Sequence, residues 1–545
     1  MSIFNYHRRR SSSVPVGVIV IGGDNPIRVQ SMTNVSTNDI EACVEQSLRI
    51  AAKGGELVRL TTQGVKEATA IGEIRHQLRL RDCDVPIVAD VHFNPKAAYV
   101  AAENTDKVRI NPGNFVDVAR TFQKLEFTDE EYQEEIDKIR RALIPFLDLC
   151  KAHNTAVRLG VNHGSLSDRI MSRYGDTPAG MVESVMEFLR ICREQDFDRI
   201  IISIKASNTV VMVQTVRLLC KAMEAEDMHF PLHLGVTEAG DDEEGRIKSA
   251  VGLGTLLAEG IGDTIRVSLS EEPEAEIPVA RQLVDHIIAR QGHAPIIEPQ
   301  PFDGEARLYS LPIEGFEQVR HPLVIGHDID QIPADWHICK ADSDPSLISD
   351  DKPVVVHSDH VNAVGEIQAF ISRMVNLGKR NPVIIRLTYA TDNIELLQIQ
   401  SGADFGTMLL NGYGSAIWLD APAIDQATRT RICLGILQAA RLRVSHTEYI
   451  SCPGCGRTLF ALQDTIKSVK AATSHLKGLK IGIMGCIVNG PGEMADADYG
   501  YVGAAAGKVS LYKNKECIEK NIPQEEALQH LIDLIKANGD WQDPL

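Results

Sequence analysis

The 545-residue sequence predicts an α/β protein with an N-terminal (β/α)8 TIM barrel, a central α/β insert domain and a C-terminal α+β domain. Three observations lead to this expectation. Eight short β-branched runs alternate with helix-sized stretches as far as Arg290, a Pro-, Gly- and acid-rich segment follows, and a cysteine-containing pattern begins after Arg443. We therefore expect domains at 1–290, 291–443 and 444–545.

The barrel is predicted from strand-like runs that recur at regular intervals. They span 27–34, 56–62, 86–93, 107–114, 156–163, 199–207, 232–240 and 263–270. One intervening helix begins with Thr128 and Glu131 in the spacing of a capping box. Eight strand–helix repeats favour a closed barrel, with an open doubly wound sheet as the alternative. Before the first strand, Gly22 and Gly23 interrupt an apolar run, which predicts a short hairpin and not a secretory signal.

In a parallel barrel, functional side chains collect where the strands end. The chain places a polar set at these positions: Arg59, Asp90, His92, Arg109, Asn111, Arg158, Asn162, Lys205, Glu238, Arg266 and Ser268. Five members are cations, and a buried cation without a counter-ion is costly. Ion pairs along the rim would explain any single arginine, whereas the whole set favours an anionic ligand such as a phosphorylated or diphosphorylated small molecule. Glu238, set among the cations, is a candidate proton donor or acceptor.

The insert is expected to alternate strands and helices. Its candidate strands are 321–327, 352–359, 381–389, 404–411 and 415–420. The histidines of this segment lack the spacing of a metal site. We therefore interpret the insert as a spacer or scaffold domain.

The last domain carries the candidate ligands of a metal centre. Cys452 and Cys455 precede a helix-like run expected from Thr458 to about His475, Cys486 follows a strand-like run at 479–485, and Glu493 lies in a Gly- and Pro-rich loop. Three thiolates and a carboxylate suit an iron–sulfur cluster with one exchangeable iron, which implies reductive chemistry on an oxygenated substrate. A structural zinc site and a redox-active dithiol stay open as alternatives.

Composition limits the partners and the compartment. The formal net charge of −18 argues against a nucleic-acid surface, and no apolar run reaches the ~20 residues of a membrane span. Eleven dispersed cysteines fit a reducing compartment, so a cytoplasmic protein is expected.

Eight motifs, in this order, resemble one enzyme family: VQSMTN, RINPGN, RLGVNHGSL, SIKAS, TEAG, IRVSL, SCPGCGRT and MGCIVNGPGE. The chain is similar to the 4-hydroxy-3-methylbut-2-en-1-yl diphosphate synthases, the iron–sulfur reductases of the non-mevalonate isoprenoid pathway. The resemblance covers residues 14–290 and about 443–545. The central segment is similar to that of the three-domain form of the family, whose insert is partly barrel-like.

The resemblance implies a [4Fe-4S] cluster on Cys452, Cys455, Cys486 and Glu493. It implies 2-C-methyl-D-erythritol 2,4-cyclodiphosphate as substrate, with its diphosphate bound by the five barrel cations. Asn111, Asn162 and Ser268 match polar binding positions of the family. The acidic residue near the reacting carbons corresponds to Glu238. Ferredoxin or flavodoxin is the implied electron donor.

Two other functions stay open at this stage. The cationic barrel also resembles pterin-binding transferases of the dihydropteroate synthase type, and a zinc-stapled anion-binding protein would use the cysteines for structure alone. In two-domain relatives the cluster of one subunit covers the barrel of its partner. For this longer chain, a homodimer of that kind and closure over its own barrel are both open.

Overall fold

The computed structural model describes residues 2–92, 94–116, 126–300, 311–326, 331–348, 350–487, 490–494 and 496–544. The chain forms two compact units. The smaller consists of Met1–Arg9, Glu243–Ile261 and Arg281–Ser445, and the larger of Arg10–Asp242, Gly262–Ala280 and His446–Leu545. The domain boundaries expected at residues 290 and 443 stay a prediction.

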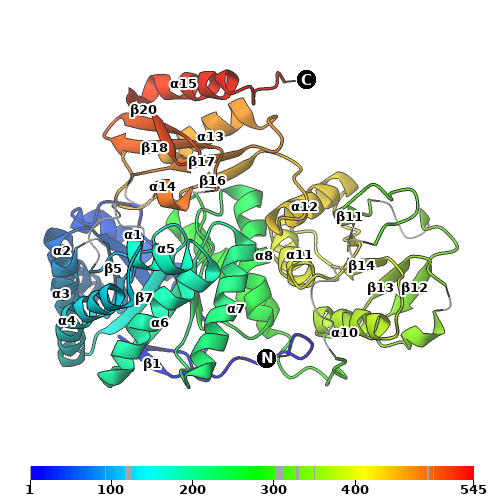
Figure 1. Ribbon diagram of the computed structural model, residues 1–545, viewed down its shortest axis with the longest axis horizontal. Helices are drawn as coiled ribbons and strands as arrows, with labels where there is room; N and C mark the ends of the chain where they lie inside the picture. Colours follow the sequence, from blue (N-terminus) through cyan, green and yellow to red (C-terminus); the bar gives the residue numbers. More distant parts are fainter. Residues whose placement is uncertain are drawn as a thin grey trace. The chain divides into compact units, whose positions relative to one another are not determined.

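The larger unit contains the predicted barrel (Figure 1). Its strands are β3 (Arg28–Met32), β4 (Leu57–Thr62), β5 (Ile87–Val91), β6 (Lys107–Ile110), β7 (Ala156–Asn162), β8 (Ile200–Lys205), β9 (His233–Leu234) and β10 (Thr264–Ile265). All neighbours pair in parallel, in the order β8-β7-β6-β5-β4-β3-β10-β9. A parallel bridge between Ile202 and Leu232 closes the ring. All eight strands were predicted, and the open-sheet alternative is wrong.

Helices follow the strands as the repeat requires. They are α1 (Ile40–Ala52), α2 (Val65–Leu80), α3 (Pro95–Asn104), α4 (Asp129–His153), α5 (Asp168–Tyr174), α6 (Pro178–Glu194), α7 (Thr209–Ala225), α8 (Asp242–Ala258) and α9 (Glu276–Ile288). The capping box is confirmed, because the Thr128 side chain accepts from the Glu131 amide and the Glu131 carboxylate accepts from the Thr128 amide. A 3-10 turn, η1 (Pro273–Ala275), precedes α9.

The predicted hairpin is also confirmed. Strands β1 (Val14–Val16) and β2 (Ile19–Ile21) pair antiparallel. Val14, Val16 and Ile21 are buried in one cluster with residues of β4, β5, β7 and β8, including Leu57 and Ala156 at the starts of their strands. The hairpin therefore covers the end of the barrel opposite the functional strand ends.

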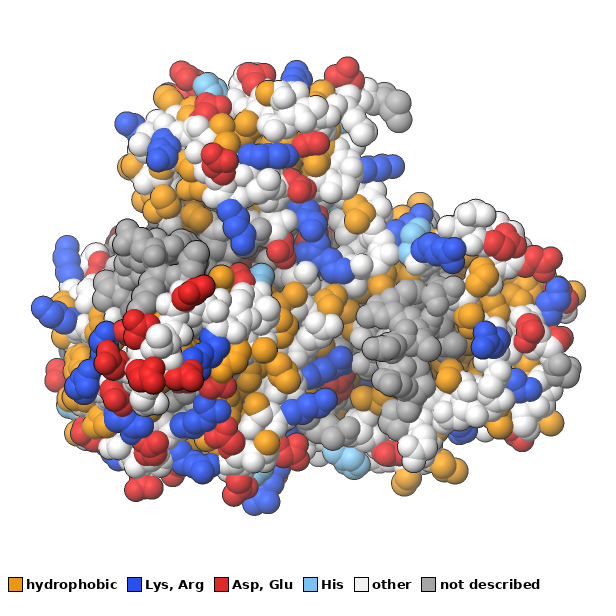
Figure 2. Space-filling model, viewed as in Figure 1, with side chains coloured by type: hydrophobic (Ala, Val, Ile, Leu, Met, Phe, Trp, Pro, Cys, Tyr) orange, Lys and Arg blue, Asp and Glu red, His pale blue; other side chains and the backbone are white. Residues whose placement is uncertain are grey.

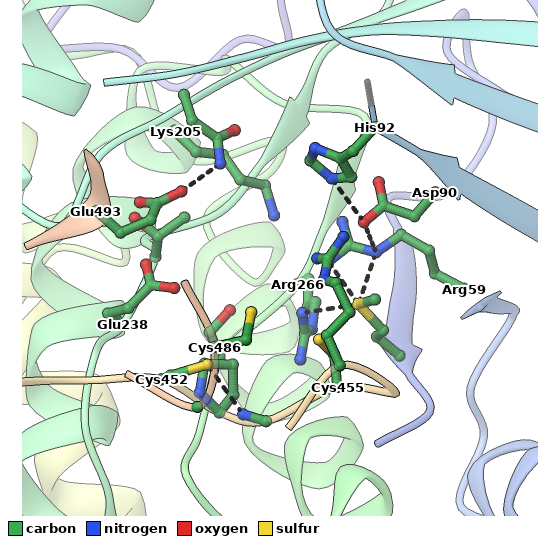
Figure 3. A pocket seen from close by; sticks show the side chains of 18 of the residues that line it. Arg59, Asp90, His92, Lys205, Glu238, Arg266, Cys452, Cys455, Cys486 and Glu493 are labelled. Carbon is green, nitrogen blue, oxygen red and sulfur yellow. Dashed lines mark hydrogen bonds and ion pairs between the residues drawn. The ribbon is translucent and has the colours of Figure 1, made fainter. Parts of the chain in front are cut away.

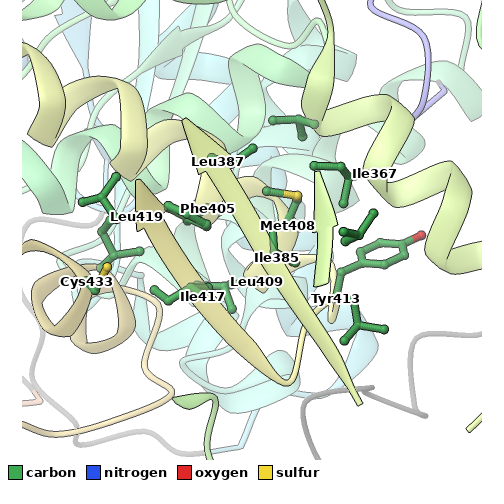
Figure 4. Close-up of a cluster of buried hydrophobic side chains, with 14 of the residues drawn as sticks. Ile367, Ile385, Leu387, Phe405, Met408, Leu409, Tyr413, Ile417, Leu419 and Cys433 are labelled. Atoms are coloured by element: carbon green, nitrogen blue, oxygen red, sulfur yellow. The ribbon is translucent and has the colours of Figure 1, made fainter. Parts of the chain in front are cut away.

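The insert folds around a five-stranded parallel sheet in the smaller unit, in the order β11-β15-β14-β13-β12. The strands are β11 (Leu323–Val324), β12 (His337–Lys340), β13 (Val354–His357), β14 (Val383–Thr388) and β15 (Ala416–Asp420). A short 3-10 turn, η4 (Pro345–Leu347), and helices α10 (Ala363–Asn376), α11 (Ile394–Leu410) and α12 (Gln426–Ala439) complete it. Figure 4 shows their buried core, in which Phe405 and Met408 of α11 belong to one hydrophobic cluster with Ile385 of β14.

One predicted strand of the insert is wrong. Residues 404–411 belong mostly to α11, which Asn393 caps by accepting from the Leu396 amide at 3.1 Å. Most α11 side chains are buried, so the polar face that normally marks a helix is missing from the sequence. The strand β12 was not predicted, because its side chains are exposed or half-buried and do not form an apolar run.

Small residues let α8 and α11 pack closely within the smaller unit. A methyl group added to Gly254 would lie 2.6 Å from the Ala403 Cβ atom, and one added to Gly406 would lie 2.9 Å from the Val251 Cα atom. Neither helix has room for a larger side chain at these positions.

The C-terminal segment of the larger unit forms a mixed five-stranded sheet, ordered β16-β17-β18-β19-β20. The strands are β16 (Glu448–Ser451), β17 (Lys480–Met484), β18 (Tyr499–Ala505), β19 (Lys508–Lys513) and β20 (Glu516–Pro523), with helices α13 (Leu462–Thr473), α14 (Gly490–Glu493) and α15 (Gln524–Ala537). The predicted strand at 479–485 is confirmed as β17. The helix expected from Thr458 begins at Leu462, because Thr458 instead closes a turn with Cys455. The expected loop around Glu493 contains the short helix α14.

In the described part of the chain, no helix combines the length and apolarity that crossing a bilayer requires. Basic and acidic side chains are interspersed on the face shown in Figure 2. The negative net charge is therefore not gathered into one field on this face.

Candidate active site

A single pocket of the larger unit brings together most of the predicted site residues (Figure 3). Its lining includes Arg59, Asp90, His92, Arg109, Arg158, Asn162, Lys205, Glu238, Arg266, Ser268, Cys452, Cys455, Cys486 and Glu493. Asn111 does not line it: its amide donates to Ser165 Oγ at 3.1 Å and accepts from the Gly113 amide at 3.0 Å. Residues at the barrel strand ends thus share a cavity with the cysteines of the C-terminal segment.

Asp90 is the counter-ion of three arginines in this pocket. Its carboxylate lies 3.3 Å from Arg109, 3.6 Å from Arg158 and 3.9 Å from Arg59. All four side chains are buried. The neighbouring cations hold the pKa of Asp90 well below its usual value against the opposing effect of burial. One negative charge therefore serves three positive ones.

His92 completes this cluster as a neutral imidazole. Burial and the charge of Arg109 lower the pKa of His92 to about 3. One of its ring nitrogens lies 3.3 Å from an Asp90 oxygen and is in hydrogen-bond contact with Arg109. His92 therefore helps to orient Asp90 and Arg109 without adding a charge.

Arg266 has a partner that the sequence did not reveal. It forms two hydrogen bonds with Glu276, at 2.7 and 2.8 Å, and Ser31 donates to the same carboxylate at 2.7 Å. Glu276 stands at the start of α9 and not at a strand end, so strand-end reasoning missed it. This pair satisfies Arg266, so Asp90 is left to the three arginines Arg59, Arg109 and Arg158.

Several buried donors around the pocket have no protein acceptor among the described residues. They are Arg109 Nε, Arg158 Nε and Nη1, and Arg457 Nε and Nη1. Six cations line the pocket (Arg59, Arg109, Arg158, Lys205, Arg266 and Arg457) against three carboxylates (Asp90, Glu238 and Glu493). Burial and the surrounding arginines lower the pKa of Lys205 well below its usual value. Unused donors and crowded positive charge both favour an anion with more than one charge.

The three cysteines enter the pocket from two loops. Cys452 and Cys455 follow β16, and Cys486 follows β17. Ser270 of the barrel donates to the Cys452 carbonyl at 3.1 Å, and Ala239 forms a parallel bridge with Ser451, so the first loop is tied to the barrel. Burial and the charges of Glu238, Cys455 and Cys486 raise the pKa of Cys452 well above its usual value. The thiols are therefore close enough to act on one another.

Glu238 and Glu493 lie side by side in the same pocket. Asn162 donates to one Glu493 oxygen, while the other oxygen, like Glu238 Oε2, has no partner among the described residues. Burial and the neighbouring Glu493 raise the pKa of Glu238 well above its usual value. Glu238 also adopts a left-handed φ of 48°, which is rare for a residue with a side chain.

The barrel and the Glu493 turn meet through two glycines. A methyl group on Gly164, at φ +75°, would lie 2.4 Å from the Gly492 carbonyl oxygen. Only glycine permits this approach at position 164. The contact lies next to the Asn162–Glu493 hydrogen bond.

The donor set suits an iron–sulfur cluster. Among the described residues, no three His, Cys, Asp or Glu side chains converge on one point as a single metal ion requires. A cluster makes no such demand, because each of its protein ligands binds a different iron. Three thiols and a carboxylate oxygen without a partner, all in one pocket, provide four such ligands.

Comparison with known proteins gives one family match for the barrel and another for the C-terminal segment. The GcpE TIM-barrel domain matches residues 11–281, and the GcpE protein C-terminal domain matches residues 448–537. Two curated relatives named 4-hydroxy-3-methylbut-2-en-1-yl diphosphate synthase (flavodoxin) match along nearly the full chain. The protein of Parabacteroides distasonis is 53% identical and covers 99% of this chain and 100% of its own. That of Bacteroides fragilis is 54% identical and covers 100% of this chain and 98% of its own.

Proposed function

Because the chain belongs to the family of 4-hydroxy-3-methylbut-2-en-1-yl diphosphate synthases (flavodoxin), we propose that the pocket described above is its active site. The protein is an oxidoreductase of isoprenoid precursor biosynthesis. It converts 2-C-methyl-D-erythritol 2,4-cyclodiphosphate to 4-hydroxy-3-methylbut-2-en-1-yl diphosphate. This reaction takes up two electrons, opens the cyclic diphosphate and releases the C3 hydroxyl as water.

The diphosphate of the substrate is bound by the barrel cations. Arg109 and Arg158 offer the unused donors, and Lys205 adds a point charge at the end of β8. Asn162 and Ser268 line the same pocket and supply uncharged polar contacts. The ligand would relieve the repulsion among cations that share Asp90.

Cys452, Cys455, Cys486 and Glu493 would hold a [4Fe-4S] cluster. When bound, this group supplies single electrons and a Lewis-acidic iron. The support is the shared pocket and the Glu493 oxygen without a partner. Asn162 holds the other Glu493 oxygen and so orients the carboxylate.

Glu238 handles the proton that the departing hydroxyl needs to leave as water. Its carboxyl group lines the pocket together with Lys205 and the three cysteines, and its Oε2 atom has no partner among the described residues. A positioned carboxyl group of this kind serves as a general acid.

Flavodoxin is the electron donor that the names of the relatives indicate. We expect the enzyme to act in the cytoplasm, and a homodimer stays a prediction. The relatives that match the full chain support neither a pterin-binding transferase nor a zinc-stapled anion-binding protein.

One observation carries the proposal: cations with unused donors and three thiols with a carboxylate line the same pocket. The test is anaerobic purification, followed by iron and sulfide analysis and turnover of the cyclic diphosphate with reduced flavodoxin. We expect about four irons and four sulfides per chain and a linear diphosphate product in the phosphorus NMR spectrum. A colourless protein that contains zinc, or one that leaves the cyclic diphosphate unchanged, would contradict the proposal.

A further inference from the structure

Arg457 is a pocket residue that the C-terminal segment contributes. It lies in a tight turn between two closing hydrogen bonds: Thr458 donates its amide to the Cys455 carbonyl at 2.9 Å, and the Cys455 amide donates to Thr458 Oγ1 at 3.1 Å. Gly456 precedes it and fits tightly, because an added methyl group would lie 2.7 Å from the Val35 carbonyl oxygen. The turn therefore fixes the direction of the Arg457 side chain.

The Arg457 side chain lies near the cysteine loops and near the barrel residues of the pocket. Its guanidinium group interacts with the Cys455 sulfur and feels the charges of Cys486 and of Asp90 across the cavity. It is buried, yet its Nε and Nη1 atoms have no acceptor among the described residues. A buried charged donor without an acceptor is costly, so a ligand is expected there.

The position of Arg109 indicates the charge of that ligand. Arg109 and Arg457 line the same pocket and repel each other, and Arg109 Nε also lacks an acceptor among the described residues. Asp90 already serves three barrel arginines. An anion bound by both guanidinium groups would satisfy the unused donors and remove the repulsion.

We propose that Arg457 is a substrate-binding residue, which takes a phosphate oxygen of the cyclic diphosphate together with the barrel cation Arg109. This inference rests on the proposed function and extends it. The substrate would then be bound by the barrel and by the cysteine turn together. Because Arg457 is two residues from Cys455, the same contact positions the diphosphate relative to the cysteine ligands.

The experiment compares Arg457→Gln and Arg457→Lys with the wild type and with two reference variants. Arg158→Gln removes a barrel cation, and Lys477→Gln removes an exposed charge from the same C-terminal segment. Each protein is prepared anaerobically, its iron and sulfide are measured, and binding of the cyclic diphosphate is followed by calorimetry without reductant. Turnover is not needed for this readout.

We expect Arg457→Gln to keep its cluster and to bind the cyclic diphosphate about ten- to a hundredfold more weakly. Arg457→Lys should fall between this variant and the wild type, because an ammonium group keeps the charge but loses the planar fork. Lys477→Gln should bind like the wild type.

Two results would overturn the inference. In the first, Arg457→Gln binds the cyclic diphosphate as tightly as the wild type. In the second, Arg457→Gln loses iron while Arg457→Lys keeps both its iron and wild-type affinity, which would assign Arg457 to the thiolates alone. Failure of the proposed function looks different, because the wild type itself would then not bind the cyclic diphosphate.

Discussion

Replacing Asp90 with asparagine tests the charge balance of the pocket. The substitution keeps the shape of the side chain and removes the negative charge that Arg59, Arg109 and Arg158 share, at distances of 3.9, 3.3 and 3.6 Å. Asp90 is 3% exposed, so water cannot replace the lost charge. We therefore expect the ligand-free variant to be less stable than the wild type.

The size of the loss in stability depends on the hydrogen bonds that the arginines keep when Asp90 is replaced. Removing one partner of a buried ion pair costs about 3–5 kcal/mol. Arg109 still donates to the Gly160 carbonyl at 2.9 Å and Arg59 still contacts the Met32 sulfur, so three full losses are not added. We expect the free energy of unfolding to fall by about 3–5 kcal/mol in total. Binding of inorganic diphosphate should become tighter, because the anion then meets three guanidinium groups that have lost their shared carboxylate.

The assay is urea unfolding at pH 7 with circular dichroism, together with calorimetry of inorganic diphosphate. Asp84→Asn is the control, because Asp84 faces Arg79 at 3.9 Å on the surface, where a pair contributes about 0–1 kcal/mol. Stability within about 1 kcal/mol of the wild type, or weaker binding of diphosphate by Asp90→Asn, would refute the reasoning.

Three further predictions concern other parts of the chain. Glu238→Gln should lower kcat at least about a hundredfold while iron and sulfide contents stay at wild-type values; unchanged turnover would remove Glu238 from proton transfer. Gly254→Ala should destabilise the smaller unit by about 1–3 kcal/mol in urea unfolding, since the methyl group would lie 2.6 Å from Ala403. Asp404 accepts from His286 at 2.8 Å and has a pKa of about 2, below the 3.8 of an unperturbed aspartate. Its carboxylate therefore contributes about 2 kcal/mol to the free energy of unfolding above pH 4, and this contribution is lost as the pH falls toward 2. The difference in the free energy of unfolding between wild type and Asp404→Asn should shrink over that interval. A difference that stays constant would contradict the lowered pKa of Asp404.

The sequence alone was sufficient to predict those elements in which the local pattern agrees with the burial of the side chains. The barrel strands recur at regular intervals between helix-sized stretches, most of them with β-branched residues, and parallel pairing then brings their ends together. The sequence failed to predict the helix α11, because most of its side chains are buried and no polar face marks the helical period.

Within the site, the sequence identified the charged residues but not the partners with which they form ion pairs and hydrogen bonds. Strand-end positions identified Arg266, whereas its partner Glu276 belongs to a helix after the strand. Arg457 was present in a recognised cysteine motif, but only the fold shows that its turn points into the barrel pocket. Asn111 satisfies the rule for site residues, yet local hydrogen bonds use its amide. Such pairings depend on the register of distant segments.

The contact between Gly164 and Gly492 limits how closely the barrel and the Glu493 turn can approach each other. Where two main chains touch with no side chain between them, their separation is fixed by the thickness of the backbone and not by adjustable packing. The separation that Asn162 spans to reach Glu493 is therefore set next to a contact between peptide groups, and we expect a side chain at position 164 to widen it.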